Sequence, residues 1–236
     1  MKTPKRYLIL LSWLAIVSCG KIEPQGDIKS QDREVAPFSE LHLKGKYRLF
    51  FVPSQKNFIN IETYDNLANN LEIKVKGNAL NITENRPTGA VDFYTVTVYS
   101  KTPLQKTTIA DSVEVNVSGK IKTPEFKLSL QDYGKFIGAV DTPNATVEMH
   151  QKSKANFLGK TKEAHLKIAD TASIVAPYWA VDYLNLEAQN GSYTEVTAQE
   201  EISGKIQNTA QLLYYGNPRR NLKIEDKTQV ENKPKP

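Results

Sequence analysis

Carboxylates in the second half of the chain are the side chains that could act as catalytic groups or metal ligands. They are Asp141, Glu148, Asp170, Asp182 and Glu187. Two carboxylates facing each other across a groove can cleave a glycosidic bond, and stacked carboxylates can hold calcium. In the repeat alignment described below, however, the column that contains Glu148 otherwise holds Lys167, Asn185 and Lys205. Asp141 and Asp170 fall in expected turns, where aspartate commonly hydrogen-bonds the backbone. The sequence therefore gives little support to a carboxylate active site.

Other catalytic and cofactor motifs are missing from the sequence. It contains no Gly-x-Ser-x-Gly motif and no glycine-rich phosphate loop. The single cysteine excludes an internal disulfide and a cysteine-built metal site. His150 and His165 are not one repeat apart, so they are not expected to stack. We predict no enzymatic activity, no cofactor and no metal site.

Aromatic residues near the C-terminal end are better candidates for a binding surface. Tyr178, Trp179, Tyr183 and Tyr193 lie close together in the sequence. Aromatic rings stack on the apolar faces of sugars and anchor protein interfaces. The structural alternative is that large rings fill the core and cap the end of a repeat domain. Outward-pointing lysines in the same half could contact anionic glycans or lipid headgroups, or could simply keep a sheet face soluble.

Residues 1–18 have the features of an export signal. A basic start precedes an apolar run over residues 7–17, which is too short for a membrane-spanning helix. The run ends at Cys19, preceded by Ile16, Val17 and Ser18, and this segment resembles the lipobox of bacterial lipoproteins. That resemblance implies cleavage before Cys19 and lipidation of its sulfur and new amino group, which would attach the chain to a membrane.

The residues after Cys19 refine this expectation. Residues 19–32 are polar and contain Pro24 and Gly26, which predicts a flexible tether. No acidic cluster follows Cys19, so we expect an outer-membrane protein on the periplasmic side in preference to the cell surface. The signal holds three of the 31 basic residues and none of the 26 acidic ones, so the net charge falls from +5 to +2 (28 minus 26). Without a dense basic patch, nucleic-acid binding is not expected.

Short segments of alternating apolar and polar residues dominate the chain, which is the period of β-strands. From about residue 112 the alternation repeats, and the last apolar position of each unit recurs at Leu130, Met149, Ile168, Leu186, Ile206 and Ile224. The steps are therefore 19, 19, 18, 20 and 18 residues. The segment 64–71 could form one helical turn, but its asparagines favour a loop.

A repeat of about 19 residues with two strands each is typical of a solenoid, in which stacked coils share one core. We predict an all-β fold with a single right-handed parallel β-solenoid over residues 33–226 and a disordered tail over 227–236. An antiparallel sandwich or barrel is the alternative, because its strands have similar spacing. A leucine-rich repeat is disfavoured because its leucine–asparagine consensus is missing.

Several segments resemble one bacterial family in their order and spacing. They are Arg33–Gly45, Tyr47–Val52, Leu71–Ile82, Phe93–Leu104 and Leu213–Pro218. Together they resemble the auto-transporter adhesin, head GIN domain family, which is common in the Bacteroidetes, and the resemblance covers roughly residues 33–230. It implies an exported, largely β-solenoid domain with no established activity.

These observations lead to one main hypothesis and two alternatives. The main hypothesis is a non-enzymatic, membrane-anchored solenoid that binds a glycan, peptidoglycan or an envelope protein. A second is a scaffold for an envelope protein complex. A third is a carbohydrate-active enzyme built on a β-helix, which would need two opposed carboxylates in one groove.

Overall fold

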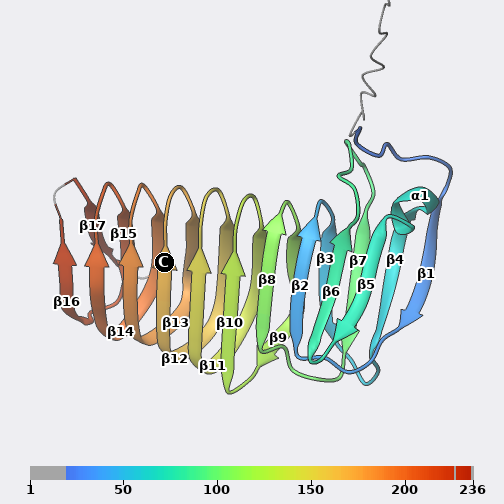
Figure 1. Cartoon of the computed structure of the whole chain (residues 1–236). Coiled ribbons are helices and arrows are strands. Elements are labelled where there is room, and N and C mark those ends of the chain that lie inside the picture. The colour runs from blue at the N-terminus through green and yellow to red at the C-terminus, as the bar shows by residue number, and fades with distance from the viewer. Residues whose placement is uncertain (1–19, 226, 235–236) are drawn as a thin grey trace, which may run out of the picture.

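The structure is a computed structural model that describes residues 20–225 and 227–234 (Figure 1). Its strands stack into an elongated, almost entirely β solenoid, which confirms the predicted fold class. The helix in the described part, α1 (Asp65–Ala68), occupies the segment for which we favoured a loop. Burial of Leu67 and Ala68, with Asp65 in the first turn, explains why a helical turn forms there despite the asparagines.

The described part of the chain contains strands β1 (Ile28–Glu34), β2 (Glu40–Gly45), β3 (Arg48–Pro53), β4 (Phe58–Tyr64), β5 (Leu71–Lys76), β6 (Ala79–Glu84), β7 (Thr95–Ser100), β8 (Lys106–Asp111), β9 (Glu114–Lys122), β10 (Glu125–Leu130), β11 (Lys135–Met149), β12 (Lys154–Ile168), β13 (Ser173–Ala188), β14 (Tyr193–Ile206), β15 (Gln211–Tyr215), β16 (Arg219–Ile224) and β17 (Gln229–Lys233). Strands β11 to β14 are long because each bends around a corner and serves both sides of the solenoid.

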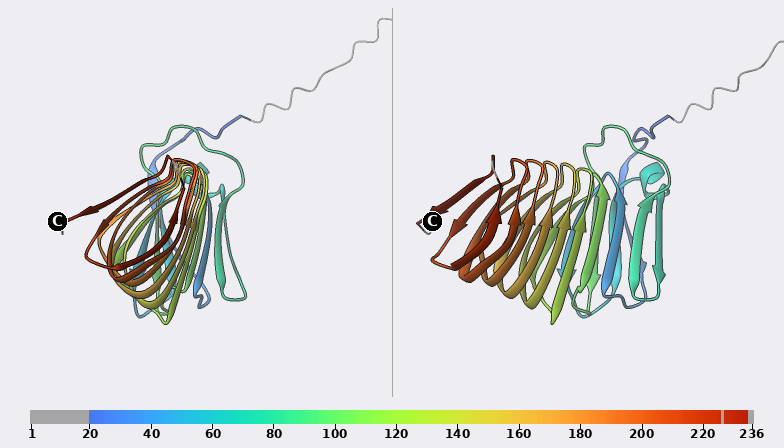
Figure 2. Two further views of the ribbon diagram at one scale, coloured as in Figure 1. Left: turned by 90° about the vertical axis from the view of Figure 1, so that its left-hand side faces the viewer. Right: turned by 60° about the vertical axis from the view of Figure 1, so that its left-hand side comes forward.

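The strands form two walls that enclose the core (Figure 2). Wall A contains, in spatial order, β5, β6, β2, β8, β10, the second halves of β11 to β14, and β16. Wall B contains β1, β4, β7, β3, β9, the first halves of β11 to β14, β15 and β17. The repeated coils pair in parallel, as predicted.

The N-terminal end departs from a simple succession of coils. Strand β2 lies between β6 and β8, and β3 lies between β7 and β9, so the first coil in sequence is inserted further inside the stack. At this end three pairings are antiparallel: β1 with β4, β4 with β7, and β5 with β6. Alternation alone does not specify this order, because inserted and terminal strands have the same period.

The register corrects one step of the sequence alignment. Ile168 pairs with Ala188 and not with Leu186, and Ala188 pairs with Ile206. The steps from 130 to 224 are therefore 19, 19, 20, 18 and 18 residues. The longer coil results from a protrusion in β13: Ala176 pairs with Val196, whereas Ala180 pairs with the next residue, Thr197.

The tight turns at one corner of the coils form a ladder of side chains. Asp132, Gln151 and Asp170 all adopt positive φ angles of 59° to 61°. The Asp132 amide donates to Gln151 Oε1, and the Gln151 amide donates to Asp170 Oδ2 at 2.9 Å. Asp170 is thus a turn residue, as expected. Asp141 lies instead within β11 at the opposite corner, where it accepts hydrogen bonds from the Lys160 amide and from Lys120 Nζ.

The core is a continuous column of apolar side chains between the walls. Four aromatic rings run through its centre: Phe126, Phe136, Phe157 and Trp179 have successive centroid distances of 5.7, 5.2 and 4.7 Å. Gly138 pairs with Phe157, and a Cβ there would lie 3.1 Å from Phe136 Cζ. The absence of a side chain at Gly138 therefore makes room for the stacked rings.

Both chain ends are more ordered than predicted. The last residues of the expected tether 19–32, from residue 28 to residue 32, belong to β1, which pairs with β4, so that part of the prediction is wrong. Within the expected disordered tail, Gln229–Lys233 forms β17 on β15. These polar segments are strands because an existing sheet edge supplies backbone partners, which the composition does not reveal.

The C-terminal coil closes the solenoid with polar residues at two inward positions, next to the apolar Leu222, Ile224 and Val230. These two positions hold Arg220 after Ile202 and Asn232 after Tyr214. Asn232 Nδ2 also donates to the Gly216 carbonyl at 3.2 Å. Inward-pointing polar residues on a terminal coil oppose edge-to-edge pairing with another sheet.

Candidate functional site

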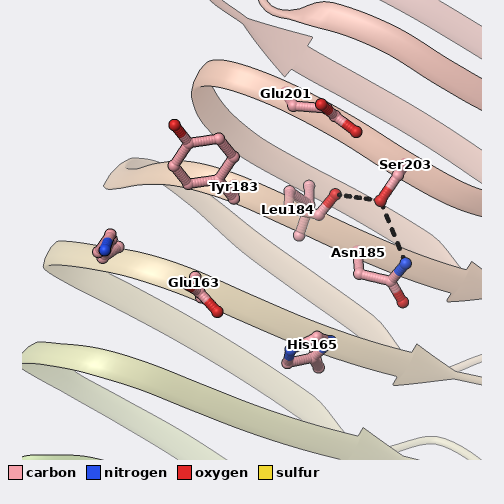
Figure 3. A pocket seen from close by; sticks show the side chains of 8 residues that line it. Glu163, His165, Tyr183, Leu184, Asn185, Glu201 and Ser203 are labelled. Atoms are coloured by element: carbon pink, nitrogen blue, oxygen red, sulfur yellow. Dashed lines mark hydrogen bonds between the residues drawn. The ribbon is translucent and has the colours of Figure 1, made fainter.

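A hollow of about 470 Å³ lies on the outer surface of wall A (Figure 3). Its lining residues are Lys162, Glu163, His165, Tyr183, Leu184, Asn185, Glu201 and Ser203. We call this hollow the Tyr183 groove. It crosses three adjacent coils, β12, β13 and β14, so that residues about 20 positions apart in sequence lie side by side.

Strand alternation and register place these side chains in two outward rows. Glu163 pairs with Tyr183, which pairs with Glu201, and these form the first row. His165, Asn185 and Ser203 form the second row, two residues further along each strand. Leu184 lies between the rows and points into the core, where it is buried. The groove therefore presents an aromatic ring flanked by acidic side chains beside a line of polar side chains.

Short side chains on β14 produce the hollow. Ser203 is the outward residue after the longer Glu201, and Asn185 Nδ2 donates to Ser203 Oγ at 3.1 Å. Gly204, at the next inward position, brings β14 close to β13. Gly204 has φ of +116°, and a Cβ there would lie only 2.2 Å from the Leu186 carbonyl oxygen. The close approach of the two backbones thus requires glycine at this position.

The two carboxylates at the Tyr183 end differ in their surroundings. Glu201 forms an ion pair with Arg219 of the next coil and accepts a hydrogen bond from its Nε at 3.1 Å. This hydrogen bond and the charge of Glu201 raise the pKa of Arg219. Glu163 and Glu201 lie two strands apart, on strands whose backbones are separated by ~9.6 Å at ~4.8 Å per strand. Since Glu201 is held by Arg219, it is placed to accept hydrogen bonds and not to deliver a proton.

The four predicted aromatic residues separate in space. Tyr183 lies in the groove and is 45% exposed. Tyr178 is 64% exposed on wall B. Trp179 is fully buried, so the exposed position we expected for it is wrong. Its ring stacks on Phe157, and its Nε1–H donates to Thr161 Oγ1 at 3.0 Å. The protrusion in β13 turns these two neighbouring residues to opposite sides of the wall.

Tyr193 lies on wall B and shares a carboxylate with a second tyrosine. Its hydroxyl donates to Glu195 Oε2 at 3.1 Å, and the hydroxyl of Tyr215 donates to Glu195 Oε1 at 2.7 Å. The hydrogen bond to Glu195, followed by burial and the carboxylate charge, raises the pKa of Tyr215 to about 12. Because both hydroxyls are engaged by Glu195, this cluster fastens the last two complete coils together.

The predicted carboxylates do not assemble into a site. The column of Glu148 continues through Lys167, Glu187 and Lys205, so Glu187 takes the place we assigned to Asn185, and the charges alternate. Asp141 and Asp182 share a shallow hollow at the corner with Lys160 and Lys162. Within residues 20–225 and 227–234, no three His, Cys, Asp or Glu side chains are grouped closely enough to hold a metal ion.

Most residues of the groove could not be selected from their type in the sequence. Glu163, Asn185, Glu201 and Ser203 were not candidates, and His165 was considered only as a surface residue. Their joint signal is positional, since each falls on an outward position of consecutive coils once the register is correct. Cys19, the predicted lipidation site, lies outside the described residues.

Comparison with known proteins places the chain in a family. The model of the family described as "Putative auto-transporter adhesin, head GIN domain" matches residues 37–218. The chain belongs to this family. The resemblance seen in the sequence is thereby confirmed, and the adhesin description is consistent with an exported or surface protein that is not an enzyme. No curated protein matches the chain.

Solved structures of low sequence identity share the fold. A putative adhesin from Bacteroides fragilis has a TM-score of 0.80 at 16% identity, covering 90% of this chain and 100% of its own. A putative adhesin from Parabacteroides distasonis has a TM-score of 0.73 at 18% identity, covering 91% and 100%. A putative lipid binding protein from the same species has a TM-score of 0.72 at 14% identity, again covering 91% and 100%. Among the residues that the structure describes, no helix is long and apolar enough to cross a membrane.

Proposed function

We propose that this protein is a membrane-anchored, non-enzymatic binding module of the cell envelope and that the Tyr183 groove binds a carbohydrate. The observation that carries the proposal is the composition of the groove: one half-exposed ring beside a row of Asn185, Ser203 and His165. Sugar rings have an apolar face, which stacks on aromatic rings, and hydroxyls, which bond to planar amides and carboxylates. The groove offers both kinds of contact side by side.

The shape of the surface favours an extended glycan that runs along the strands. A second hollow, lined by Glu187, Gln189, Lys205 and Gln207 among others, continues from the groove along the same strands β12 to β14. From Tyr183 to Gln189 the surface spans six residues, or about 20 Å at ~3.3 Å per residue. A glycan chain, including the glycan strand of peptidoglycan, could lie along this length. An envelope protein that places polar groups and an apolar surface in the groove is the competing partner.

We base membrane attachment on the lipobox resemblance alone. The contacts of the first described residues indicate where a lipid anchor would join the solenoid. Arg86 Nη2 donates to the Gly20 carbonyl at 2.9 Å, and the Ile22 amide donates to the Pro87 carbonyl at 2.9 Å. Asn66 Nδ2 donates to the Glu23 carbonyl at 2.8 Å. A lipid on Cys19 would therefore hold the solenoid near the bilayer, with the periplasmic side of the outer membrane as our preferred location.

A glycan array followed by titration calorimetry tests the binding proposal. The chain from Gly20 to Pro236 would be screened against envelope polysaccharides and peptidoglycan fragments, and then compared with Tyr183→Ala. Tyr133→Ala is the matched control, because Tyr133 is 56% exposed on a tight turn away from the groove. Loss of an aromatic ring that stacks on a nucleobase costs ~1–3 kcal/mol, and we expect a cost of this size for a sugar. Tyr183→Ala should therefore weaken binding about tenfold or more, and the control should leave binding unchanged. Equal effects of both substitutions would show that the Tyr183 groove is not the carbohydrate-binding site.

A carbohydrate-active enzyme remains the second candidate because Glu163 and Glu201 flank Tyr183 on strands whose backbones are ~9.6 Å apart. Inverting glycosidases hold two carboxyl groups ~6.5–9.5 Å apart. The Arg219–Glu201 ion pair argues against it. Product analysis of any glycan bound by the array separates the two functions. Release of reducing ends that disappears in both Glu163→Gln and Glu201→Gln would establish the enzyme, whereas retention of the intact glycan supports the binding module.

A further inference from the structure

Exposed apolar side chains gather on the outer surface of wall B. Eight large hydrophobic residues are exposed in the described part of the chain, and four of them lie here. They are Ile137 (42% exposed), Leu158 (42%), Val175 (40%) and Tyr178 (64%). We call these four residues the wall B patch. Clustered exposure of this kind marks an interaction surface, whereas single exposed apolar residues are ordinary.

The strand register makes the patch continuous. Leu158 of β12 pairs with Ala139 of β11, so Ile137 is its diagonal neighbour, within reach at ~7–8 Å. On the other side, the pairing of β12 with β13 is interrupted between Ala155–Ile174 and Gly159–Trp179. Leu158 lies in this interval, beside the protrusion that carries Tyr178. The hydroxyl of Thr197 donates to the Pro177 carbonyl at 2.6 Å and fixes this protrusion to the next coil. Tyr178 is therefore held outward by the backbone.

Lysines border the patch at both ends of its strands. Lys135 and Lys154 pair with each other at the start of β11 and β12, and Lys120 and Lys160 lie at the far end beside Asp141. Two of these lysines have carboxylate partners: Lys135 contacts Glu114 at 3.4 Å, and Lys120 contacts Asp141 at 2.9 Å. Among the described residues, Lys154 and Lys160 form no ion pair. Glu195 also lies beside the patch, since it pairs with Val175. The four lysines therefore outnumber the three carboxylates Glu114, Asp141 and Glu195 by one.

We propose that wall B rests on an anionic lipid bilayer through this patch. Aliphatic side chains and a tyrosine with lysines at the strand ends of β11 and β12 match the boundary between headgroups and acyl chains. Tyrosine sits there with its ring in the apolar layer and its hydroxyl in water. The lysine stems can lie along apolar surface while their ammonium groups contact lipid phosphates. A protein partner or a second copy of the chain would bury the apolar residues equally well, but neither would require the lysine border.

This surface is independent of the Tyr183 groove, since the two lie on opposite walls. Docking through wall B would turn wall A and its groove away from the bilayer. A bound glycan and the membrane would then not compete for the same face. The inference does not require a lipid on Cys19, because the contact is made by folded residues alone.

Vesicle sedimentation with the lipid-free chain from Gly20 to Pro236, which contains every described residue, tests this inference. One vesicle contains equal parts of phosphatidylglycerol and phosphatidylcholine, and the other contains phosphatidylcholine alone. We expect binding to the anionic vesicle that weakens with salt, and weaker binding to the neutral one. Lys154→Gln and Lys160→Gln should each reduce anionic binding about fivefold, which corresponds to about 1 kcal/mol per lysine. Leu158→Gln should also reduce binding to the anionic vesicle.

Matched variants on wall A keep the test specific. Lys127→Gln and Lys223→Gln remove the same charge from the outward side of the opposite wall and should leave vesicle binding unchanged. Circular dichroism of every variant establishes that it is folded. Failure of the parent chain to bind at low salt would overturn the inference, as would equal losses in wall A and wall B variants. A dimer that Leu158→Gln converts to a monomer would show instead that the patch joins two copies.

Discussion

Replacing Trp179 should lower the free energy of unfolding of the solenoid without changing any surface contact. The ring is fully buried, stacks on Phe157 at a centroid distance of 4.7 Å, and donates its Nε1–H to Thr161 Oγ1 at 3.0 Å. Replacement of a buried tryptophan by alanine costs ~3–5 kcal/mol, because both the transfer free energy and the cavity oppose folding. Against a typical domain stability of ~5–15 kcal/mol, this is a large fraction of the total.

Two smaller substitutions divide this cost into its parts. Trp179→Phe keeps a stacked ring but removes the donor, and Thr161→Val removes the acceptor and leaves a buried N–H unpaired. An unpaired buried donor costs ~1–3 kcal/mol, so we expect Thr161→Val to destabilise by that amount in the parent chain and by much less in the Trp179→Phe background. The difference measures the coupling between the two side chains.

Urea denaturation followed by far-ultraviolet circular dichroism provides the free energies of unfolding. The midpoint should fall in each variant, while the slope with denaturant should stay close to that of the parent chain. Trp13 and Trp179 are the two tryptophans of the sequence, so a chain that begins at Gly20 carries Trp179 alone. Its fluorescence should be shielded from acrylamide in the native state and become quenched on unfolding. Easy quenching of the native protein, or a loss below about 1 kcal/mol for Trp179→Ala, would refute the buried position.

Three further predictions follow from other parts of the molecule. Gly204→Ala should destabilise the fold by ~2 kcal/mol or more, because it combines a positive φ with a contact to the Leu186 carbonyl; an unchanged midpoint in urea would contradict the close backbone approach. Arg220→Val should promote end-to-end association, seen as a larger mass in light scattering after size exclusion, since it removes an inward charge from the terminal coil; the outward Arg219→Gln is the control, and a monomeric Arg220→Val would argue against the polar cap. The hydrogen bond to Glu195 raises the pKa of Tyr215 from its ordinary 10.0 to about 12, so its contribution to stability is present below pH 10 and is lost as pH rises toward 12. Tyr215→Phe should flatten the decline in melting temperature over that window, and an identical decline in the variant would show that other groups cause it.

The fold could be predicted from the sequence because each coil has nearly the same length, so apolar residues recur at that spacing along the chain. Leu130, Met149 and Ile168 recur every 19 residues and do stack in register. The prediction failed at Leu186, because Ile168 pairs with Ala188, two residues further along. The protrusion in β13 contributes one of these residues, since the offset between β12 and β13 rises from 19 to 20 across it. Local alternation cannot reveal such an insertion. The next coil is shorter, so Ile206 and Ile224 still occupy their predicted positions.

The candidate site was harder to predict than the fold. Trp179 and Tyr178 are neighbours in sequence with similar chemistry, yet one lies in the core and the other is the most exposed tyrosine of the group. Their sides are set by the backbone protrusion, which depends on the pairing of β12, β13 and β14 together. The Tyr183 groove likewise depends on short side chains in β14 being placed beside longer ones in β13. Such relations between coils are tertiary, so only Tyr183 could be selected from its residue type.

A crystal structure of the chain from Gly20 to Pro236 with the oligosaccharide selected by the glycan array is the most direct test of the account. We predict a sugar ring stacked on Tyr183, hydroxyls bonded to Asn185 and Ser203, and the glycan extending along β13 toward Gln189. A sugar bound on wall B, or at either end of the solenoid with the Tyr183 groove empty, would contradict the proposed function.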